Sequence, residues 1–246
     1  MSTHRDVELA GSLAAVRTRL AHAAEAAGRP VRDIDLLPIT KFFPASDVVI
    51  LRRLGCTEFG ESREQEAARK VADLRSAFPS DEIRWHMVGH IQRNKARAIA
   101  RWAYAAHSVD SARLIAALGG GAEQELDGGG RTRPLRVYLQ ISLDGDPDRG
   151  GVDVNKPDLI DELCAATHAI DALEFAGLMG IPPLNWEAED AFARLQAERD
   201  RVQRSFTHPL GLSAGMSGDM ETAVRYGSTC VRVGTALMGQ RPLTSP

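Results

Sequence analysis

Eight short apolar runs recur along the chain, and longer polar stretches separate them. The runs cover residues 34–40, 57–60, 84–88, 104–109, 135–141, 173–178, 210–213 and 230–233. Near-continuous apolar runs of this length are typical of strands in a parallel sheet that is covered on both faces. Each run therefore predicts one buried strand.

The intervening stretches place apolar residues at helical spacing and end at glycine or proline. They predict helices over 46–54, 64–77, 92–101, 111–118, 158–168, 187–206 and 219–226, and an opening helix over 6–27 that stops at Gly28. A strand followed by a helix, repeated eight times in 246 residues, is typical of an α/β fold, the (β/α)8 TIM barrel. An open doubly wound sheet is the alternative, because periodicity does not show whether a sheet closes. We expect residues 1–246 to form a single barrel domain with an extra N-terminal helix.

Two loops and one proline depart from this rhythm. Residues 119–130 are rich in glycine, which predicts a surface connection before the fifth strand. Residues 144–151 follow that strand on the side where barrels build their sites, so they form either a mobile lid or, as the sequence favours, a plain solvated loop. Pro38 removes a ladder donor, so we expect it to shorten or bulge the first strand.

Composition excludes several classes of protein. The chain is 43% hydrophobic and 26% charged with a formal net charge of −3, which suits one globular core and argues against a nucleic-acid partner. The cysteines Cys56, Cys164 and Cys230 are odd in number and widely spaced, so they predict neither a disulfide framework nor a zinc site, and we expect no metal. The N-terminus lacks the apolar core of a signal peptide, and no apolar run approaches the ~20 residues of a membrane span. We therefore expect a cytoplasmic protein without a membrane partner.

Three segments place polar groups at the C-terminal ends of predicted strands. Lys41 follows the first strand, Ser213 follows the seventh, and Gly234 and Thr235 follow the eighth. Barrels of this kind build their sites at that end and commonly hold phosphate in the loops after the last two strands. Glycine lets the backbone approach an anion, and serine and threonine hydroxyls donate to it. For each segment taken alone, the alternative is a solvated lysine or a helix cap and turn.

A lysine and a phosphate site together suggest the ligand. A lysine in a partly buried pocket is disfavoured in its charged form, which frees the amine to condense with a carbonyl. A phosphate, an aldehyde and a lysine together describe pyridoxal 5'-phosphate (PLP). Arg232 lies two residues before Gly234, so its side chain points into the barrel, where it could hydrogen-bond the pyridine nitrogen. An arginine in an ordinary ion pair is the alternative.

Seven segments match the motifs of a known family. They are residues 39–41, 59–66, 85–95, 107–111, 177–183, 212–220 and 227–235, in this order over nearly the whole chain. The chain resembles the pyridoxal phosphate homeostasis protein family, whose members are single-domain relatives of the alanine racemase N-terminal barrel (PLP fold type III).

The resemblance implies PLP held as a Schiff base on Lys41, with Ser213, Gly234 and Thr235 around the phosphate and Arg232 near the ring nitrogen. It also implies a role in vitamin B6 balance and no defined turnover reaction, so we predict no catalytic residue. We expect PLP-dependent apoenzymes as candidate recipients, and a monomer or weak dimer.

The chain departs from the family pattern at Ser62, where asparagine is usual, and at Pro38. These departures leave the contact of residue 62 with the cofactor open. The cluster His90, Gln92, Asn94 and Lys95 matches the family's third-strand motif. It shapes either the cofactor mouth or a second surface, or it is a solvated helix start.

Two other functions stay open. A racemase needs a second acid–base group opposite its lysine, which the two-domain relatives take from an added domain. This chain ends at Pro246, so we expect no such domain, and of Tyr104, Tyr138 and Tyr226 only Tyr138 is a candidate near the pocket. The alternatives to a PLP carrier are therefore a small fold-type III racemase or lyase that uses Lys41 alone, and a barrel that binds another phosphorylated metabolite.

Overall fold

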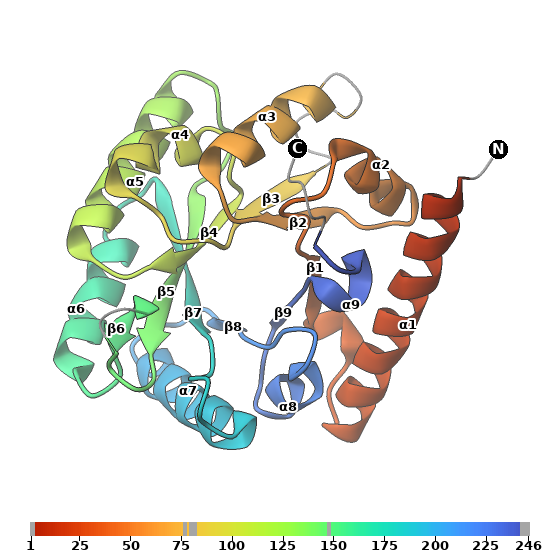
Figure 1. Ribbon diagram of the computed structural model, residues 1–246. Helices are drawn as coiled ribbons and strands as arrows, with labels where there is room; N and C mark the ends of the chain where they lie inside the picture. Colours follow the sequence, from red (N-terminus) through yellow and green to blue (C-terminus); the bar gives the residue numbers. More distant parts are fainter. Residues whose placement is uncertain (1–2, 76–77, 79–82, 147–148, 242–246) are drawn as a thin grey trace.

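A ring of eight parallel strands forms the centre of the protein in a computed structural model that describes residues 3–75, 78, 83–146 and 149–241 (Figure 1). The strands of the ring are β1 Asp35–Pro38, β2 Glu58–Glu61, β3 Arg84–Met87, β4 Ala105–Val109, β5 Leu135–Ser142, β7 Leu173–Gly180, β8 Gly211–Ser213 and β9 Cys230–Val233. Each coincides with one of the predicted apolar runs, so the eight strands are confirmed.

The ring is a nearly closed barrel. Neighbouring strands are parallel in the order β1-β9-β8-β7-β5-β4-β3-β2. The two ends of this order meet where Ile39 bridges Gly60 and the Thr40 amide donates to the Gly60 carbonyl at 2.9 Å. This closure confirms the predicted TIM barrel and excludes the open doubly wound sheet.

Pro38 lies at this seam. The Ile39 amide donates to Val233 in β9, and the Thr40 amide donates to Gly60 in β2. Because alternate residues of a strand face alternate neighbours, Pro38 turns its missing donor toward β2. In the described residues the seam rests on the single Ile39–Gly60 bridge, and the strand ends at Pro38 instead of residue 40, as expected from the proline.

Helices surround the ring (Figure 1). They are α1 His4–Ala26, α2 Ala45–Arg53, α3 Glu64–Arg75, α4 Ala96–Ala100, α5 Ala112–Asp127, α6 Pro157–His168, α7 Ala188–Gln203, α8 Met220–Arg225 and α9 Thr235–Met238, with 3-10 turns η1 Val31–Asp33 and η2 Arg93–Lys95. The predicted end of the third helix, residues 76–77, lies outside the described residues. The opening helix α1 begins with a capping box between Thr3 and Asp6 and packs against α2, α8 and α9, which confirms the predicted addition to the barrel.

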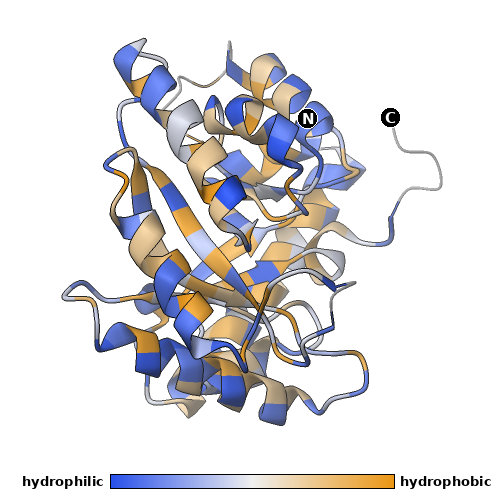
Figure 2. Ribbon diagram, turned by 90° about the vertical axis from the view of Figure 1, so that its left-hand side faces the viewer, coloured by the Kyte–Doolittle hydropathy of each residue, from blue (hydrophilic) through white to orange (hydrophobic). Residues whose placement is uncertain are grey.

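The hydrophobic core lies between the ring and the helices. Phe59, Phe175 and Phe192 are fully buried or nearly so, and individual outer helices carry both hydrophilic and hydrophobic residues (Figure 2), as amphipathic helices do. Within the part of the chain that the structure describes, no helix combines the length and apolar character that a bilayer span requires.

The prediction of a glycine-rich surface connection over residues 119–130 was wrong for most of that segment. Helix α5 continues through residues 119–127. A Cβ on Gly121 would lie 3.0 Å from Arg97 Cα and 3.2 Å from Ala100 Cβ of α4. Glycine therefore lets the two helices approach closely, and this packing outweighs its low helix propensity.

We expect Gly120→Ala to raise the free energy of unfolding by about 0.5–1 kcal/mol. No atom lies within 4 Å of the position that a Cβ on Gly120 would take, so the variant gains helix propensity without a clash. Urea unfolding measures the change. The matched variant Gly121→Ala has the same propensity gain but meets Arg97 and Ala100, so it should be destabilised. Equal stabilisation by both substitutions would contradict the packing explanation.

Candidate functional site

Lys41 lies at the C-terminal rim of the barrel, just after β1. Its side chain is half-buried. Among the described residues its Nζ forms no ion pair, and it lies 5.7 Å from the centroid of the Phe42 ring. Phe42 has a φ of 69°, in the left-handed region that is costly for a bulky residue. Backbone strain of this kind marks segments that the surrounding structure holds in place, often at functional sites.

Two arginines also approach the Phe42 ring. The guanidinium carbon of Arg63 lies 5.3 Å from its centroid, and that of Arg241 lies 3.8 Å away. Arg63 also pairs with Glu66 at 2.8 Å. The rim beside Lys41 therefore gathers positive charge, which favours an anionic ligand.

A buried ion pair supports the backbone that precedes Lys41. Lys70 Nζ donates to Glu61 Oε1 and, at 2.9 Å, to the Thr40 carbonyl, while Thr40 Oγ1 donates to Glu61 Oε1 at 2.7 Å. Burial raises the pKa of Glu61, although Lys70 opposes that rise. The sequence pattern reveals neither role, because only the fold brings Lys70 of α3 against Glu61.

Arg232 points into the barrel, as the period of its strand predicts. It is 6% exposed. Its Nη1 donates to Ser213 Oγ at 2.7 Å, and its Nη2 donates to the Gly180 carbonyl at 3.1 Å. Burial lowers the pKa of its guanidinium, and Cys230 and Asp219 oppose that shift only in part. Arg232 forms no ion pair with a described carboxylate, so the structural alternative of an ordinary ion pair lacks support.

Ser213 is fully buried at the end of β8. Its hydroxyl accepts the Arg232 hydrogen bond and lies 2.8 Å from His107 Nδ1. The structure thus brings together Ser213 and Arg232, two of the predicted site residues. A contact of Ser213 with phosphate stays a prediction.

Gly234 and Thr235 follow β9 at the same rim. A Cβ on Gly234 would lie 3.7 Å from Ile39 Cβ, an ordinary contact, so the surrounding side chains do not require glycine here. The missing side chain leaves the backbone accessible to a ligand. The next amide, that of Ala236, donates to Ser217 Oγ at 3.2 Å, which joins the segments after β8 and β9 as predicted for neighbouring strand ends.

The third-strand cluster lies beyond β3. His90, Gln92 and Asn94 are exposed, and Lys95 Nζ lies 3.6 Å from Glu64 Oε2. These positions favour a solvated helix start. Ser62 follows β2, and its carbonyl oxygen lies only 2.1 Å from where a Cβ on Gly89 would stand, which explains the glycine in that motif.

Two histidines that the sequence motifs contain, but to which we assigned no role, lie inside the barrel. His86 on β3 places its Nδ1 2.8 Å from Nε2 of His107 on β4. Burial, followed by the electrostatic effect of the neighbouring His86 and the charge of Arg232, holds the pKa of His107 well below its usual value. Polar residues within otherwise apolar strands were the signal that could have identified them.

The 144–151 loop is tied to its neighbours rather than free. Arg149 Nη2 donates to the Pro182 carbonyl at 2.8 Å, and the Gly151 amide donates to Asp110 Oδ2 at 3.2 Å. The chain then forms the short strand β6, Val152–Asp153, beside β5. Residues 147–148 of the predicted loop lie outside the described residues.

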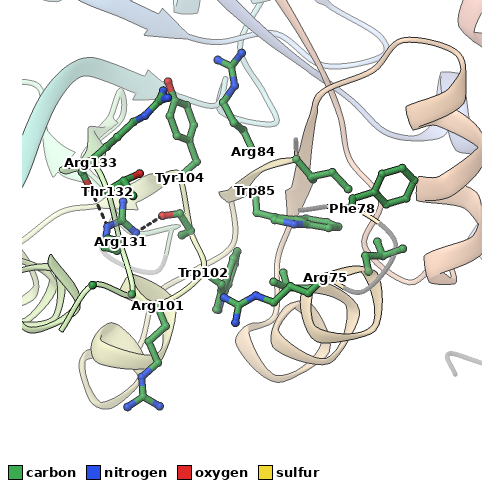
Figure 3. Close-up of a pocket in the computed structure, with 16 residues that line it drawn as sticks. Arg75, Phe78, Arg84, Trp85, Arg101, Trp102, Tyr104, Arg131, Thr132 and Arg133 are labelled. Atoms are coloured by element: carbon green, nitrogen blue, oxygen red, sulfur yellow. Dashed lines mark hydrogen bonds between the residues drawn. The ribbon is translucent and has the colours of Figure 1, made fainter. Parts of the chain in front are cut away.

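A cavity of about 340 Å³ lies away from Lys41, and Figure 3 shows the residues that line it. It is lined by segments that precede β3, β4 and β5, and arginines project around it. Several are engaged: Arg84 pairs with Glu58 at 2.7 Å, and Arg131 donates to backbone carbonyls before β4. This end of a barrel stabilises the fold and rarely carries chemistry. Within the described ranges, no group of three or more His, Cys, Asp or Glu residues is arranged to hold a metal ion.

Comparison with known proteins identifies the family to which the chain belongs. The family model of the alanine racemase N-terminal domain matches residues 12–242. The pyridoxal phosphate homeostasis protein of Mycobacterium tuberculosis is 58% identical over 248 residues, covering 98% of this chain and 96% of that one. The Escherichia coli protein of the same name is 33% identical over 237 residues, covering 95% of this chain and 97% of its own.

A solved structure agrees with these matches. PipY of Synechococcus elongatus with PLP bound is 31% identical and has a TM-score of 0.77, covering 94% of this chain and 100% of that one. The likeness extends over nearly the full length in sequence and in structure. The chain therefore belongs to the pyridoxal phosphate homeostasis proteins, within the alanine racemase N-terminal domain family.

Proposed function

We propose that residues 1–246 act as one unit that holds PLP as a Schiff base on Lys41 and serves the intracellular balance of this cofactor without turning over a substrate. Relatives named for PLP homeostasis, and PipY with PLP bound, support the ligand. As part of the same proposal, the protein acts in the cytoplasm as a monomer or weak dimer, and PLP-dependent apoenzymes receive the cofactor.

The proposal rests mainly on one observation, the buried Arg232 guanidinium without a described carboxylate partner. A buried cation is costly unless it is compensated. Leu37 pairs with Arg232 across the sheet, and Lys41 lies four residues beyond Leu37, in the turn that follows the end of β1. A ligand that reaches from Lys41 down toward Arg232 would supply a further acceptor for this guanidinium, beside Ser213 and the Gly180 carbonyl.

The residues present fit PLP. Bound PLP supplies an aldehyde, a phosphate anion and a pyridine nitrogen that accepts a hydrogen bond. Lys41 would bind the aldehyde carbon, Gly234 and Thr235 would lie beside the phosphate with Ser213, and Arg232 would donate to the ring nitrogen. Because guanidinium keeps its protons, it leaves that nitrogen unprotonated and the ring a weak electron sink, which suits holding the cofactor more than carbanion chemistry.

Of the lysines in the chain, Lys41 is also the one best placed to react with PLP. The sequence has four lysines, at positions 41, 70, 95 and 156. Lys70 is buried against Glu61, and Lys95 lies 3.6 Å from Glu64. Lys156 is exposed. Only position 41 combines partial burial with freedom from an ion pair among the described residues.

The tyrosines favour a binder over a racemase. Tyr138 is buried and stacked on His107, with ring centroids 4.5 Å apart, and burial raises the pKa of its phenol. Tyr104 precedes β4 at the other end of the barrel, and Tyr226 packs against the outer core. Their positions give no support to an acid–base partner opposite Lys41.

Borohydride labelling tests the proposal. The purified protein with added PLP is expected to develop a visible absorption band, and reduction followed by peptide mapping should place the label on Lys41. The same sample should exchange the α proton of alanine in deuterium oxide no faster than free PLP does. A label on Lys156 or no band would refute the Schiff base, and fast exchange would favour the small racemase.

A further inference from the structure

A continuous row of buried polar side chains crosses the barrel interior beneath the proposed cofactor site. Arg232 Nη1 donates to Ser213 Oγ at 2.7 Å, and Ser213 Oγ lies 2.8 Å from His107 Nδ1. His107 Nε2 lies 2.8 Å from His86 Nδ1, and His86 Nε2 lies 3.2 Å from Glu58 Oε2. We call these five residues the interior chain. They come from β9, β8, β4, β3 and β2, so it exists only in the closed barrel.

The interior chain is sealed from water over most of its length. Ser213 and His107 are fully buried, His86 is 3% exposed and Arg232 is 6% exposed. Tyr138 covers one face of His107 by stacking. The Glu58 side chain is 14% exposed at the opposite end and pairs with Arg84 at 2.7 Å. One end therefore lies below the proposed cofactor and the other lies near the base of the barrel.

The charges at the two ends fix the order of the protons between them. Arg232 can only donate, so Ser213 Oγ accepts a hydrogen bond from it. The Ser213 hydroxyl can in turn donate a hydrogen bond to His107 Nδ1. His107 then carries its proton on Nε2 and donates it to His86 Nδ1. His86 in turn carries its proton on Nε2, facing the Glu58 carboxylate.

The reverse order is unfavourable for an electrostatic reason. It would require His86 to donate from Nδ1, which leaves the lone pair of its Nε2 opposite Glu58. Burial alone would raise the pKa of Glu58, but the His86 contact and the Arg84 and Arg136 charges lower it overall, so this group is a carboxylate. The 3.2 Å contact is not well aligned for a hydrogen bond, yet a carboxylate still favours an N–H over a lone pair at that distance.

Other charged and titratable groups also influence this interior. They are Asp35 from β1, Arg84 from β3, Tyr104 before β4, Arg136 and Tyr138 from β5, Glu174 from β7 and Cys230 from β9. None of them stands between two members of the interior chain in its hydrogen-bond sequence. Glu58 is therefore the carboxylate that terminates it.

We propose that Glu58, His86 and His107 are positioning residues for Arg232: through Ser213 they hold its guanidinium in one orientation and so set the hydrogen bond that it offers to the ring nitrogen of PLP. This role rests on the proposed function. It gives the interior polar residues a purpose beyond filling the barrel, since apolar residues of similar volume would fill it without the cost of burying polar groups.

The first test needs no cofactor. In protein with 15N-labelled histidine, long-range 1H–15N NMR should show a proton on Nε2 of His86 and of His107 and none on Nδ1 of either. In Glu58→Gln the neutral amide can donate or accept, so His86 should lose its single tautomer. Arg84→Met keeps the Glu58 carboxylate and should retain it. A proton on Nδ1 of either histidine in the unaltered protein would overturn the proposed proton order.

The second test measures PLP binding by its absorption. His107→Phe keeps the stacking ring but removes both nitrogens, so Ser213 loses its hydrogen bond to His107 and holds Arg232 less firmly. This loss should weaken PLP binding by about 2- to 10-fold and shift the bound-cofactor band. Glu58→Gln should shift the same band. It should disturb folding less than His107→Phe does, because the Glu58 side chain lies partly exposed at the end of the barrel.

Thr167→Val is the matched control for lost buried polarity. Thr167 is fully buried and donates to the Leu163 carbonyl in α6, away from the interior chain. It should lower stability and leave the band and the affinity unchanged. Equal spectra for Glu58→Gln, His107→Phe and Thr167→Val would overturn the positioning role. Failure of the unaltered protein to bind PLP would refute the proposed function itself, whereas the NMR result judges the interior chain independently.

Discussion

Lys70→Met is expected to lower the free energy of unfolding by about 3–5 kcal/mol, because it leaves a buried carboxylate without its cation. Glu61 is 0% exposed and Lys70 is 8% exposed. The second oxygen of Glu61 has no hydrogen-bond partner among the described residues, and only the neutral Thr40 hydroxyl would still donate to the first oxygen. For a chain of this length the loss corresponds to a fall in Tm of about 6–20 °C, which calorimetry or urea unfolding would measure.

An exposed ion pair provides the control. Arg225 and Glu189 lie 2.6 Å apart with side chains 60% and 58% exposed, so Arg225→Met should cost less than about 1 kcal/mol. The double variant Glu61→Gln/Lys70→Met removes the uncompensated charge and should recover much of the loss. If Lys70→Met and Arg225→Met cost the same, the buried pair does not support the barrel in the way we infer.

The loss of stability in Lys70→Met should also depend on pH. Burial raises the pKa of Glu61 in the folded protein, and the variant removes the lysine that opposes this rise. The folded variant therefore binds a proton that the unfolded chain releases above its ordinary pKa of about 4.3. Stability must then fall as pH rises, so the destabilisation should be larger at pH 8 than at pH 5. The opposite trend would contradict the assignment.

Lys41→Ala is expected to abolish the borohydride-stable PLP label and the visible band completely. The substitution removes the amine, while Arg232, Ser213 and the Gly234–Thr235 backbone stay in place. Noncovalent binding of PLP should persist more weakly, and equilibrium dialysis would measure it. The fold should be unaffected, because Lys41 is half-buried and forms no ion pair among the described residues.

Lys156→Ala is the matched lysine control. Lys156 is exposed and precedes α6, so its loss should leave the band and the label unchanged. An unchanged band in Lys41→Ala would show that the cofactor is attached elsewhere. Loss of unfolding cooperativity in Lys41→Ala would instead point to a structural role for this lysine.

Sequence patterns predicted the barrel well because its main signal is local. Each strand is a short apolar run, and each helix has its own periodicity and stop signals, so the eight strands were found close to their observed positions. The same regularity placed Arg232 inside the barrel and Lys41 at its rim, since both follow from a period of two and from where a strand ends. Their proposed contacts with the cofactor stay predictions.

The errors and omissions came from contacts between distant segments. From its neighbours in the sequence, Gly121 is expected to be part of a flexible segment. In the fold it instead allows α5 to approach α4. Glu61 and Lys70 form a buried pair only because α3 packs on β2, and His86 meets His107 only because β3 and β4 are neighbours. No local pattern contains these distances.

By itself the sequence determined the order and type of the eight ring strands and the helices between them, and the rim position of the candidate lysine, because backbone periodicity and strand termini are properties of neighbouring residues. Only the tertiary structure decided how the barrel closes at Ile39 and Gly60, which charges are buried together, and that a single row of polar groups links Arg232 to Glu58. The physical reason is that burial and hydrogen-bond partners depend on which surfaces meet, and residues far apart in the chain supply those surfaces.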